Sequence, residues 1–338
     1  MPAAAVPQIH IPDLAELQAA FALTRTASVE TPLIEADAIA ALTGAARVFV
    51  KPESLQRTGS FKFRGAYWRV AQLSEDEKRR GVVAYSSGNF AQGLAAAARM
   101  AGVPCTIVMP DDAPPAKRAG AERHGATIVA SHHGDKPREE VASALAREIS
   151  ETEGRALLHP FDDAAIVAGQ AGAGLEAIEQ FARLGLPNPD IVYCSVGGGG
   201  LIGGVALAFH YLSPLTRVIA VEPQGYDGMG QSLANAAVTR VSSGRATICD
   251  ALQATAPGAA PFAAARKAAI GHVTVDDASV RKAMRLAFET MKLVLEPSGA
   301  VAIAAVMQAG EALEGQNVLA YATGGNIALE DFSRLVAA

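Results

Sequence analysis

Short runs of apolar residues alternate along this chain with longer segments in which apolar residues recur at helical spacing. Residues 82–85, 105–109, 191–194, 218–221 and 317–321 are such runs, and each is typical of a buried strand. Helix-like segments separate most of them, which is the order that parallel strands and crossover helices produce. The pattern predicts an α/β fold built on doubly wound, parallel sheets.

Apolar stripes place the predicted helices. The first is expected over residues 12–30, where Leu14, Leu17, Phe21 and Leu23 would share one face. Residues 224–260 are rich in Gly, Ala and Ser and support no assignment. Further helices are predicted over residues 36–42, 62–73, 90–100, 138–152, 174–184, 277–293 and 298–309, and another helix is predicted to end at His124. Further strands are predicted around Val48 and over residues 127–129 and 156–158.

Composition narrows the class of protein. Half of the 338 residues are hydrophobic but only 5% are aromatic, which favours closely packed layers of helix and sheet over a sandwich of aromatic-rich strands. The net charge is −5 and no block of basic residues occurs, so nucleic acid is excluded as a partner. Cys105, Cys194 and Cys249 are scattered without a CxxC pair, so neither a disulfide framework nor a zinc site is expected.

Membrane partners are not expected either. No apolar stretch is long and uninterrupted enough to span a bilayer. The N-terminus lacks the charged start and the apolar core of a secretory signal. The sequence therefore predicts a cytoplasmic protein.

One lysine stands at an unusual place. Lys62 follows a strand-like run and a polar loop whose last residues, Thr58-Gly59-Ser60, are typical of a helix start. In the first turn of a helix the dipole disfavours an ammonium group, and the flanking Phe61 and Phe63 would remove water from it. Both effects lower the pKa of an amine and suit a nucleophile or a Schiff base. The alternative is an ordinary solvated lysine.

Two further segments carry candidate chemistry. Four consecutive glycines, residues 197–200, follow a buried strand and precede a helix, where bare backbone N–H groups can hold a phosphate. A flexible linker is the alternative, although linkers do not stand between a strand and an apolar helix. Residues 86–89, Ser-Ser-Gly-Asn, offer hydroxyls, an amide and N–H groups to a carboxylate, or form only a capping turn.

Residues 51–66, which surround Lys62, resemble the cofactor-lysine segment of the fold-type-II pyridoxal-phosphate enzymes, above all the threonine/serine dehydratase and serine racemase branch. The resemblance covers nearly the whole chain. It implies two doubly wound three-layer domains of the tryptophan-synthase β type, the small one (residues 81–158) inserted in a large one (residues 1–80 and 159–338). It also implies a homodimer. Because Thr323 lies close to the end of the given sequence, we do not expect the C-terminal effector domain of biosynthetic threonine dehydratases.

The same resemblance assigns the cofactor site. It implies that Lys62 carries pyridoxal phosphate as a Schiff base and that Asn89 bonds the ring hydroxyl. Thr323 would face the pyridine nitrogen, where a hydroxyl leaves that nitrogen unprotonated and weakens the ring as an electron sink. The other cofactor contacts implied are Phe61 and Glu296 near the ring, and Gly197, Gly198, Gly199, Gly200 and Leu201 at the phosphate.

The substrate side is less uniform within the family. Ser86 and Asn89 would hold the substrate carboxylate, and Arg138 aligns with an arginine that approaches the substrate in racemases. Ser87 could donate a proton on the face opposite Lys62, which racemisation needs. Phe90 stands where the family usually has His, and we expect it to favour a bulkier or less polar substrate. Outside the family context, Thr323, Glu296 and Arg138 would be read as turn or surface residues.

A divalent cation such as Mg²⁺ or Ca²⁺ is a further question. Glu222 matches the first ligand of a cation site in the family, and hard cations need several oxygen ligands. The second carboxylate is expected at residue 228, but this chain has Gly228 there, with Asp227 one residue earlier. That departure counts against the site.

The resemblance, together with the candidate residues, implies a pyridoxal-phosphate-dependent ammonia-lyase, which would convert a β-hydroxy amino acid to a 2-oxo acid and ammonia. Serine, threonine, 3-hydroxyaspartate, phenylserine and an intermediate of hydroxyectoine breakdown are the candidate substrates. An amino-acid racemase is the first alternative, because of Ser87. The second is a binding protein for the cofactor or an amino acid without catalysis, which Phe90 and the altered cation motif permit.

Overall fold

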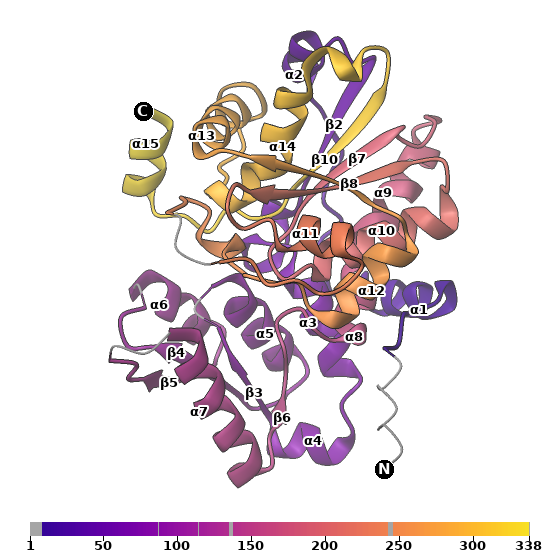
Figure 1. Cartoon of the computed structure of the whole chain (residues 1–338). Coiled ribbons are helices and arrows are strands. Elements are labelled where there is room, and N and C mark those ends of the chain that lie inside the picture. Colours follow the sequence, from indigo (N-terminus) through magenta and orange to yellow (C-terminus); the bar gives the residue numbers. More distant parts are fainter. Residues whose placement is uncertain (1–8, 87, 114, 135–137, 243–245, 338) are drawn as a thin grey trace.

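The computed structural model describes residues 9–86, 88–113, 115–134, 138–242 and 246–337 (Figure 1). Its strands form one sheet in the order β1-β2-β10-β7-β8-β9 and another in the order β5-β4-β3-β6. Apart from the β1–β2 pair, all neighbouring strands are parallel. The strands are β1 (Ile34–Glu35), β2 (Arg47–Pro52), β3 (Val82–Tyr85), β4 (Cys105–Pro110), β5 (Thr127–Ser131), β6 (Ala156–Leu157), β7 (Ile191–Ser195), β8 (Arg217–Pro223), β9 (Gly271–Val275) and β10 (Asn317–Ala322).

Helices connect these strands and cover both faces of each sheet. They are α1 (Leu14–Thr24), α2 (Asp37–Thr43), α3 (Lys62–Ala71), α4 (Glu75–Arg80), α5 (Asn89–Met100), α6 (Pro115–Arg123), α7 (Arg138–Glu153), α8 (Ala164–Gln170), α9 (Gly172–Arg183), α10 (Gly200–Leu212), α11 (Gly228–Asn235), α12 (Ala259–Lys267), α13 (Asp277–Leu286), α14 (Pro297–Ala309) and α15 (Leu329–Ala337).

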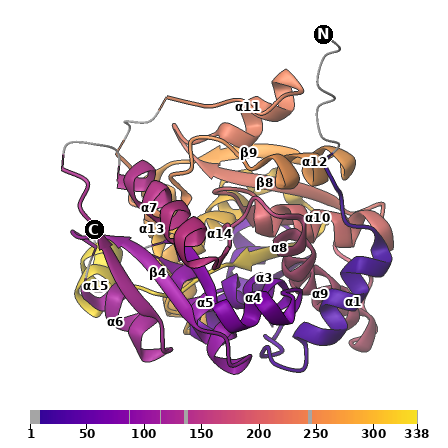
Figure 2. The same cartoon turned by 90° about the horizontal axis from the view of Figure 1, so that it is seen from below.

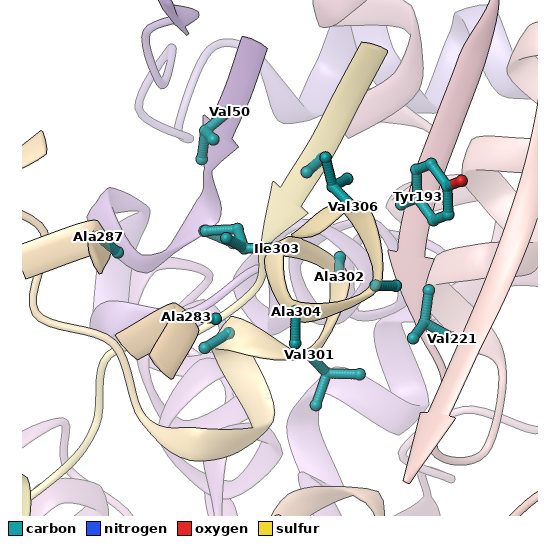
Figure 3. Packing of buried hydrophobic residues seen from close by; sticks show 14 of the residues in the cluster. Val50, Tyr193, Val221, Ala283, Ala287, Val301, Ala302, Ile303, Ala304 and Val306 are labelled. Atoms are coloured by element: carbon teal, nitrogen blue, oxygen red, sulfur yellow. The ribbon is translucent and has the colours of Figure 1, made fainter. Parts of the chain in front are cut away.

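The two faces of the six-stranded sheet pack into two different hydrophobic cores. Successive side chains of a strand point to opposite faces. Tyr193 of β7 therefore points to the face covered by α14. Val221 of the neighbouring strand β8 and Val50 of β2, which lies beyond β10, point to the same face (Figure 3). Val192 and Cys194, the neighbours of Tyr193, lie in the other core with α9 and α10.

The four-stranded sheet is built in the same way. Val82 and Ala84 of β3 pack with α5, whereas Val83 packs with Ala142 of α7 on the opposite face. Each sheet is thus the middle of three layers, which confirms the predicted fold class. Figure 1 shows α3 and α8 between the two sheets, and both lie near the centre of the molecule when it is seen from below (Figure 2). α3 packs against α5, a helix that covers the four-stranded sheet.

All four strands of the smaller sheet lie between residues 82 and 157, and the strands of the larger sheet lie on either side of that stretch. This arrangement supports the division at residues 81 and 158. The division into two domains stays our proposal.

The order of the larger sheet brings distant segments together at one edge. β10, the last strand, lies between β2 and β7, with Ala322 opposite Pro52 and Ala320 opposite Tyr193. The loops that leave the carboxyl ends of these strands therefore meet: the loop before Lys62, the glycine run and the segment after Ala322. Ligands of open α/β sheets bind at such edges.

Some predicted elements end elsewhere in the structure. α1 stops at Thr24 rather than residue 30, and the predicted helix over residues 277–293 becomes α13 followed by a π-helical turn, Ala287–Met291. α4, α8, α11, α12, α15 and β9 were not predicted. For α4 a signal was present, because Ser74 and Glu77 form a capping box. β9 has only one fully buried residue, so its apolar run is weak.

Candidate functional site

Lys62 is the first residue of α3, as predicted. The helix begins after Phe61, whereas Thr58 and Gly59 belong to a separate 3-10 turn and do not cap α3. The Lys62 amine donates a hydrogen bond to the Pro160 carbonyl at 3.0 Å. Burial lowers the pKa of Lys62 to about 8, so a neutral amine is accessible near physiological pH.

The aromatic rings around Lys62 differ from those that the sequence suggested. Its Nζ lies 5.1 Å from the centre of the Phe61 ring and 5.8 Å from that of Phe90. Phe63, the other sequence neighbour, points away from Lys62 and is fully buried in the core that α5 forms with the four-stranded sheet. A helix turns about 100° per residue, so Phe63 cannot share the face of Lys62.

The glycine run joins β7 to α10. Gly199 has φ +95°, a backbone conformation that residues with a side chain rarely adopt, and Gly200 begins the helix. A Cβ atom on Gly198 would lie 2.1 Å from the Phe161 ring, and one on Gly199 would lie 2.8 Å from Pro261. The backbone here is therefore bare because its neighbours leave no space for side chains. Leu201, in the first turn of α10, is buried.

Two hydroxyl groups mark the carboxyl ends of β7 and β10. Ser195 Oγ and Thr323 Oγ1 lie 3.2 Å apart, and the Thr323 hydroxyl also lies 3.4 Å from the Ser298 carbonyl. Thr323 is 3% exposed. Ser195 was not singled out from the sequence, although its place at the end of the strand that leads into the glycine run could have flagged it.

The residues predicted around the substrate are only partly described. Ser86 follows β3, and its hydroxyl accepts a hydrogen bond from the Gly88 N–H at 3.3 Å. Phe90 is 2% exposed and packs in the core beside α3. Ser87 lies outside the described residues, and Arg138 begins α7 with a side chain that is also outside them.

Asn89 and Glu296 do come together. Asn89 is the first residue of α5, and its Nδ2 donates to Glu296 Oε1 at 2.6 Å. Glu296 directly precedes α14 and is 6% exposed. Burial raises the pKa of Glu296 to about 7, with a further increase from the Asp250 carboxylate, while the bond from Asn89 acts in the opposite direction. The carboxyl can therefore hold a proton near neutral pH.

Glu296 should make stability depend on pH. An ordinary glutamate releases its proton near pH 4.5, but the folded protein keeps the Glu296 proton to about pH 7. Between these values the unfolded state binds fewer protons, so this group's contribution to the free energy of unfolding is full below pH 4.5 and falls as pH rises. Relative to wild type, apo Glu296→Gln should therefore gain about 3 kcal/mol over this range. Urea titrations at several pH values measure this, and a constant difference would contradict it.

A cluster of buried charges around Arg64, two residues after Lys62, was not predicted from the sequence. Arg64 donates to both oxygens of Glu53 at 2.8 Å, and it also contacts Glu176 of α9. Lys51 Nζ lies 2.6 Å from Glu176, and all four side chains are at most 5% exposed. The cluster ties β2, α3 and α9 together, so it holds the helix that carries Lys62.

Tyr85 and His159 were also missed. The Tyr85 hydroxyl lies 3.1 Å from His159 Nε2, while His159 Nδ1 accepts hydrogen bonds from the N–H groups of Phe161 and Asp162. Burial lowers the pKa of His159, which favours the neutral ring with its proton on Nε2. Tyr85 stands directly before Ser86, and His159 directly before the Pro160 carbonyl that Lys62 contacts. The position of Tyr85 next to Ser86 was the signal in the sequence that could have identified it as a candidate site residue.

Glu222 has partners within the chain. Its two oxygens accept hydrogen bonds from the N–H groups of Met229 and Gly230 at 2.9 and 3.0 Å, in the first turn of α11. His272 Nε2 lies 2.9 Å from the same carboxylate. These contacts account for both oxygens of Glu222, and a cation there stays an untested prediction.

A second group of candidate metal ligands lies elsewhere. Ligand atoms of Asp111, Asp112 and His133 lie within 4.8 Å of one another, after the ends of β4 and β5. Both carboxylates are exposed, and exposed groups of this kind are common without an ion. We assign no metal to them. Among the described residues no helix is both long and apolar enough to cross a membrane.

The arrangement fits pyridoxal phosphate. It offers an amine of lowered pKa, a bare-backbone turn at a helix N-terminus for the phosphate, and a buried hydroxyl pair at Ser195 and Thr323. Asn89, at the start of α5, adds an amide donor. An aldehyde cofactor with an anionic tail needs these groups.

Comparison with known proteins agrees. A family model described as "Pyridoxal-phosphate dependent enzyme" matches residues 25–324. An L-threo-3-hydroxyaspartate ammonia-lyase from a Pseudomonas species is 39% identical over 307 residues, which are 90% of this chain and 92% of that protein.

Solved structures are similar too. A threonine deaminase from T.th. has a TM-score of 0.87 and 39% identity, covering 94% of this chain and 99% of that one. Maize serine racemase has a TM-score of 0.88 and 31% identity, covering 96% and 97%. Because the family model and these alignments span most of its length, this chain belongs to the family of pyridoxal-phosphate dependent enzymes.

Proposed function

We propose that the protein is an ammonia-lyase that converts a β-hydroxy amino acid to a 2-oxo acid and ammonia. The observation that carries this proposal is the Lys62 amine, whose pKa is lowered to about 8 by burial beside the ring of Phe61. The similarity to ammonia-lyases and a threonine deaminase points to elimination as the reaction.

Lys62 acts twice in this proposal. Its Nζ would hold the cofactor, and the same amine would accept the α-proton of the substrate. A base works best when its pKa lies near the operating pH, which a value of about 8 satisfies. The hydrogen bond to the Pro160 carbonyl at 3.0 Å keeps the amine in place.

Bound pyridoxal phosphate supplies the electron sink that makes the α-proton acidic. Thr323, backed by Ser195, would meet the pyridine nitrogen with a hydroxyl instead of a carboxylate, which keeps that sink weak. A weak sink suits elimination, because the β-hydroxyl leaves as the α-proton is lost. The hydroxyl departs with one proton as water, and the released enamine reacts with one water to give the 2-oxo acid and ammonia.

The remaining assignments follow the same plan. Gly197 to Gly200 and Leu201, at the N-terminus of α10, would hold the cofactor phosphate. Asn89 would bond the ring hydroxyl of the cofactor. Ser86 and the N–H groups at the start of α5 would bind the substrate carboxylate, and Ser87 and Arg138 are proposed as further substrate contacts. Phe61 and Glu296 would flank the ring.

A panel of substrates tests the function. Purified holoenzyme is assayed for 2-oxo acid and ammonia with L-serine, L-threonine, L-threo-3-hydroxyaspartate and phenylserine. We expect equal amounts of the two products from at least one of them. Cofactor binding without turnover on any β-hydroxy amino acid would instead indicate the non-catalytic binding protein.

Amino-acid racemisation is the second candidate, because maize serine racemase aligns along 96% of this chain. Ser87 would then protonate the face opposite Lys62. Chiral chromatography of the same reactions decides the matter: D-product in excess of 2-oxo acid, lost selectively in Ser87→Ala, would favour the racemase.

The phosphate cradle predicts that Gly198→Ala weakens cofactor binding. The new Cβ would lie 2.1 Å from the Phe161 ring, so either that ring or the loop must move. We expect the Kd for pyridoxal phosphate, measured by titrating apoprotein, to rise at least about tenfold. Gly203→Ala, in α10 with contacts of 3.4 Å or more, is the matched control and should bind as wild type does. Equal affinities for both variants would refute the assignment.

Phe90→His tests the substrate pocket. The Phe90 ring lies 5.8 Å from Lys62 Nζ, so a polar ring there would change what the substrate side chain meets. We expect the ratio of kcat/KM for serine to that for phenylserine to rise by about tenfold. An unchanged ratio would reject a role for Phe90 in specificity.

A homodimer and a cytoplasmic location also stay predictions from the sequence. Light scattering on the eluted holoenzyme measures the mass of the assembly, and twice the 34.8 kDa of the chain is expected.

A further inference from the structure

A chain of hydrogen bonds links the end of β10 to the proposed cofactor site through Asn89. Asn326 Nδ2 donates to the Thr58 carbonyl at 2.8 Å and to Asn89 Oδ1 at 2.7 Å. Asn89 Nδ2 then donates to Glu296 Oε1 at 2.6 Å. Four segments far apart in the sequence meet in this way: the turn before Lys62, the start of α5, the start of α14 and the loop after β10.

The Thr58 carbonyl determines which groups donate and which accept along this series of hydrogen bonds. A backbone carbonyl only accepts hydrogen bonds, so the atom of Asn326 that faces Thr58 must be the NH₂ group. The same NH₂ group faces Asn89, so Asn89 must present its oxygen to Asn326. The Asn89 NH₂ group is thereby turned toward Glu296. It has two hydrogens and Glu296 uses one of them, so one hydrogen remains.

Two glycines make room for the chain. A Cβ on Gly59 would lie 2.5 Å from Asn326 Oδ1, and Gly59 has φ +74°, which also disfavours any other residue. A Cβ on Gly324 would lie 2.2 Å from Glu296 Oε1 and 3.2 Å from Asn89 Nδ2. The backbone on both sides is therefore shaped around these three side chains.

We propose that Asn326 is a positioning residue that sets the orientation of the Asn89 amide, so that an N–H of Asn89 is directed at the ring hydroxyl of the cofactor. The inference rests on the proposed role of Asn89. If the Asn89 amide were reversed, an oxygen would face the ring hydroxyl, and the donor that stabilises its ionised form would be lost. Asn326 thus acts on the electronic state of the cofactor without touching it.

Asn326→Asp is the decisive variant. It has nearly the size of the native side chain, but its carboxylate accepts hydrogen bonds and donates none. The Asn89 NH₂ group would then turn toward residue 326 and its oxygen toward Glu296. We expect a displaced absorption maximum of the bound cofactor, a shifted pH dependence of that band, and a Kd for pyridoxal phosphate about tenfold higher.

A double-mutant cycle separates positioning from general support. Asn89→Ala should show the same spectral displacement as Asn326→Asp, and Asn326→Asp should add nothing further in the Asn89→Ala background. Asn235→Asp, on the exposed face of α11, is the control for an added charge and should leave the spectrum unchanged. Thermal unfolding of the apo forms shows whether each variant is folded.

The outcomes separate this inference from the proposed site. If Asn89→Ala leaves the spectrum unchanged, the role of Asn89 at the ring is wrong. If Asn89→Ala displaces the band while Asn326→Asp does not, or if the two effects add, the positioning role of Asn326 is wrong and the site stands. Matching, non-additive displacements support it.

Discussion

Lys62→Ala is expected to lower kcat/KM for 2-oxo acid release by about 10³-fold or more, because it removes both the amine that holds the cofactor and the base for the α-proton. The fold should persist, since the Lys62 amine has one described hydrogen bond, to the Pro160 carbonyl. Steady-state kinetics with saturating pyridoxal phosphate measure the loss. Added primary amines should restore part of the rate by replacing the missing base.

Lys78→Ala is the matched control. Lys78 lies on α4, where it pairs with Glu75 on the surface, and its loss should leave kcat/KM within about twofold of wild type. Full activity of Lys62→Ala, or an equal loss in both variants, would disprove the role of Lys62.

Arg64→Met is expected to have the largest effect on stability. The guanidinium bonds both oxygens of Glu53 and also reaches Glu176, and its side chain is fully buried. Burial alone opposes its charge, but the two carboxylates outweigh burial and raise the pKa of Arg64. Without it, the two carboxylates stay buried, and Lys51 is the basic side chain that the described residues still place near them. Breaking such a cluster costs about 3–5 kcal/mol of unfolding free energy.

Urea denaturation of the apoprotein measures this loss. Arg79→Met is the control, because Arg79 pairs with Asp76 on the surface of α4 and such pairs contribute about 1 kcal/mol or less. A loss for Arg64→Met no greater than that of the control would show that the cluster does not hold α3. Cofactor binding should also weaken in Arg64→Met, since α3 carries Lys62.

The parts of the site that are continuous in sequence could be predicted. Lys62 at a helix start and the glycine turn between a strand and a helix each carry their signal within a few residues. The doubly wound fold followed from the alternation of strands and helices for the same reason. Local physics, namely dipoles, capping and apolar spacing, suffices for such features.

The features that were missed depend on contacts between distant residues. Arg64 and Glu176 are 112 positions apart, and Asn89 and Asn326 are 237 apart. No spacing rule connects such residues, because the order of strands in the sheet decides which loops meet. Local sequence can also mislead. Phe63 is next to Lys62 in the sequence, which suggested a contact, but the helix directs the Phe63 ring into another core.

Reduction of the holoenzyme with borohydride tests the central claim most directly. Borohydride converts the bond between a lysine and pyridoxal phosphate to a stable amine, and mass spectrometry of the digested protein then locates the label. The account predicts a single label on the peptide that contains Lys62, absent in Lys62→Ala. A label on another lysine, or none on a protein that binds the cofactor, would contradict it.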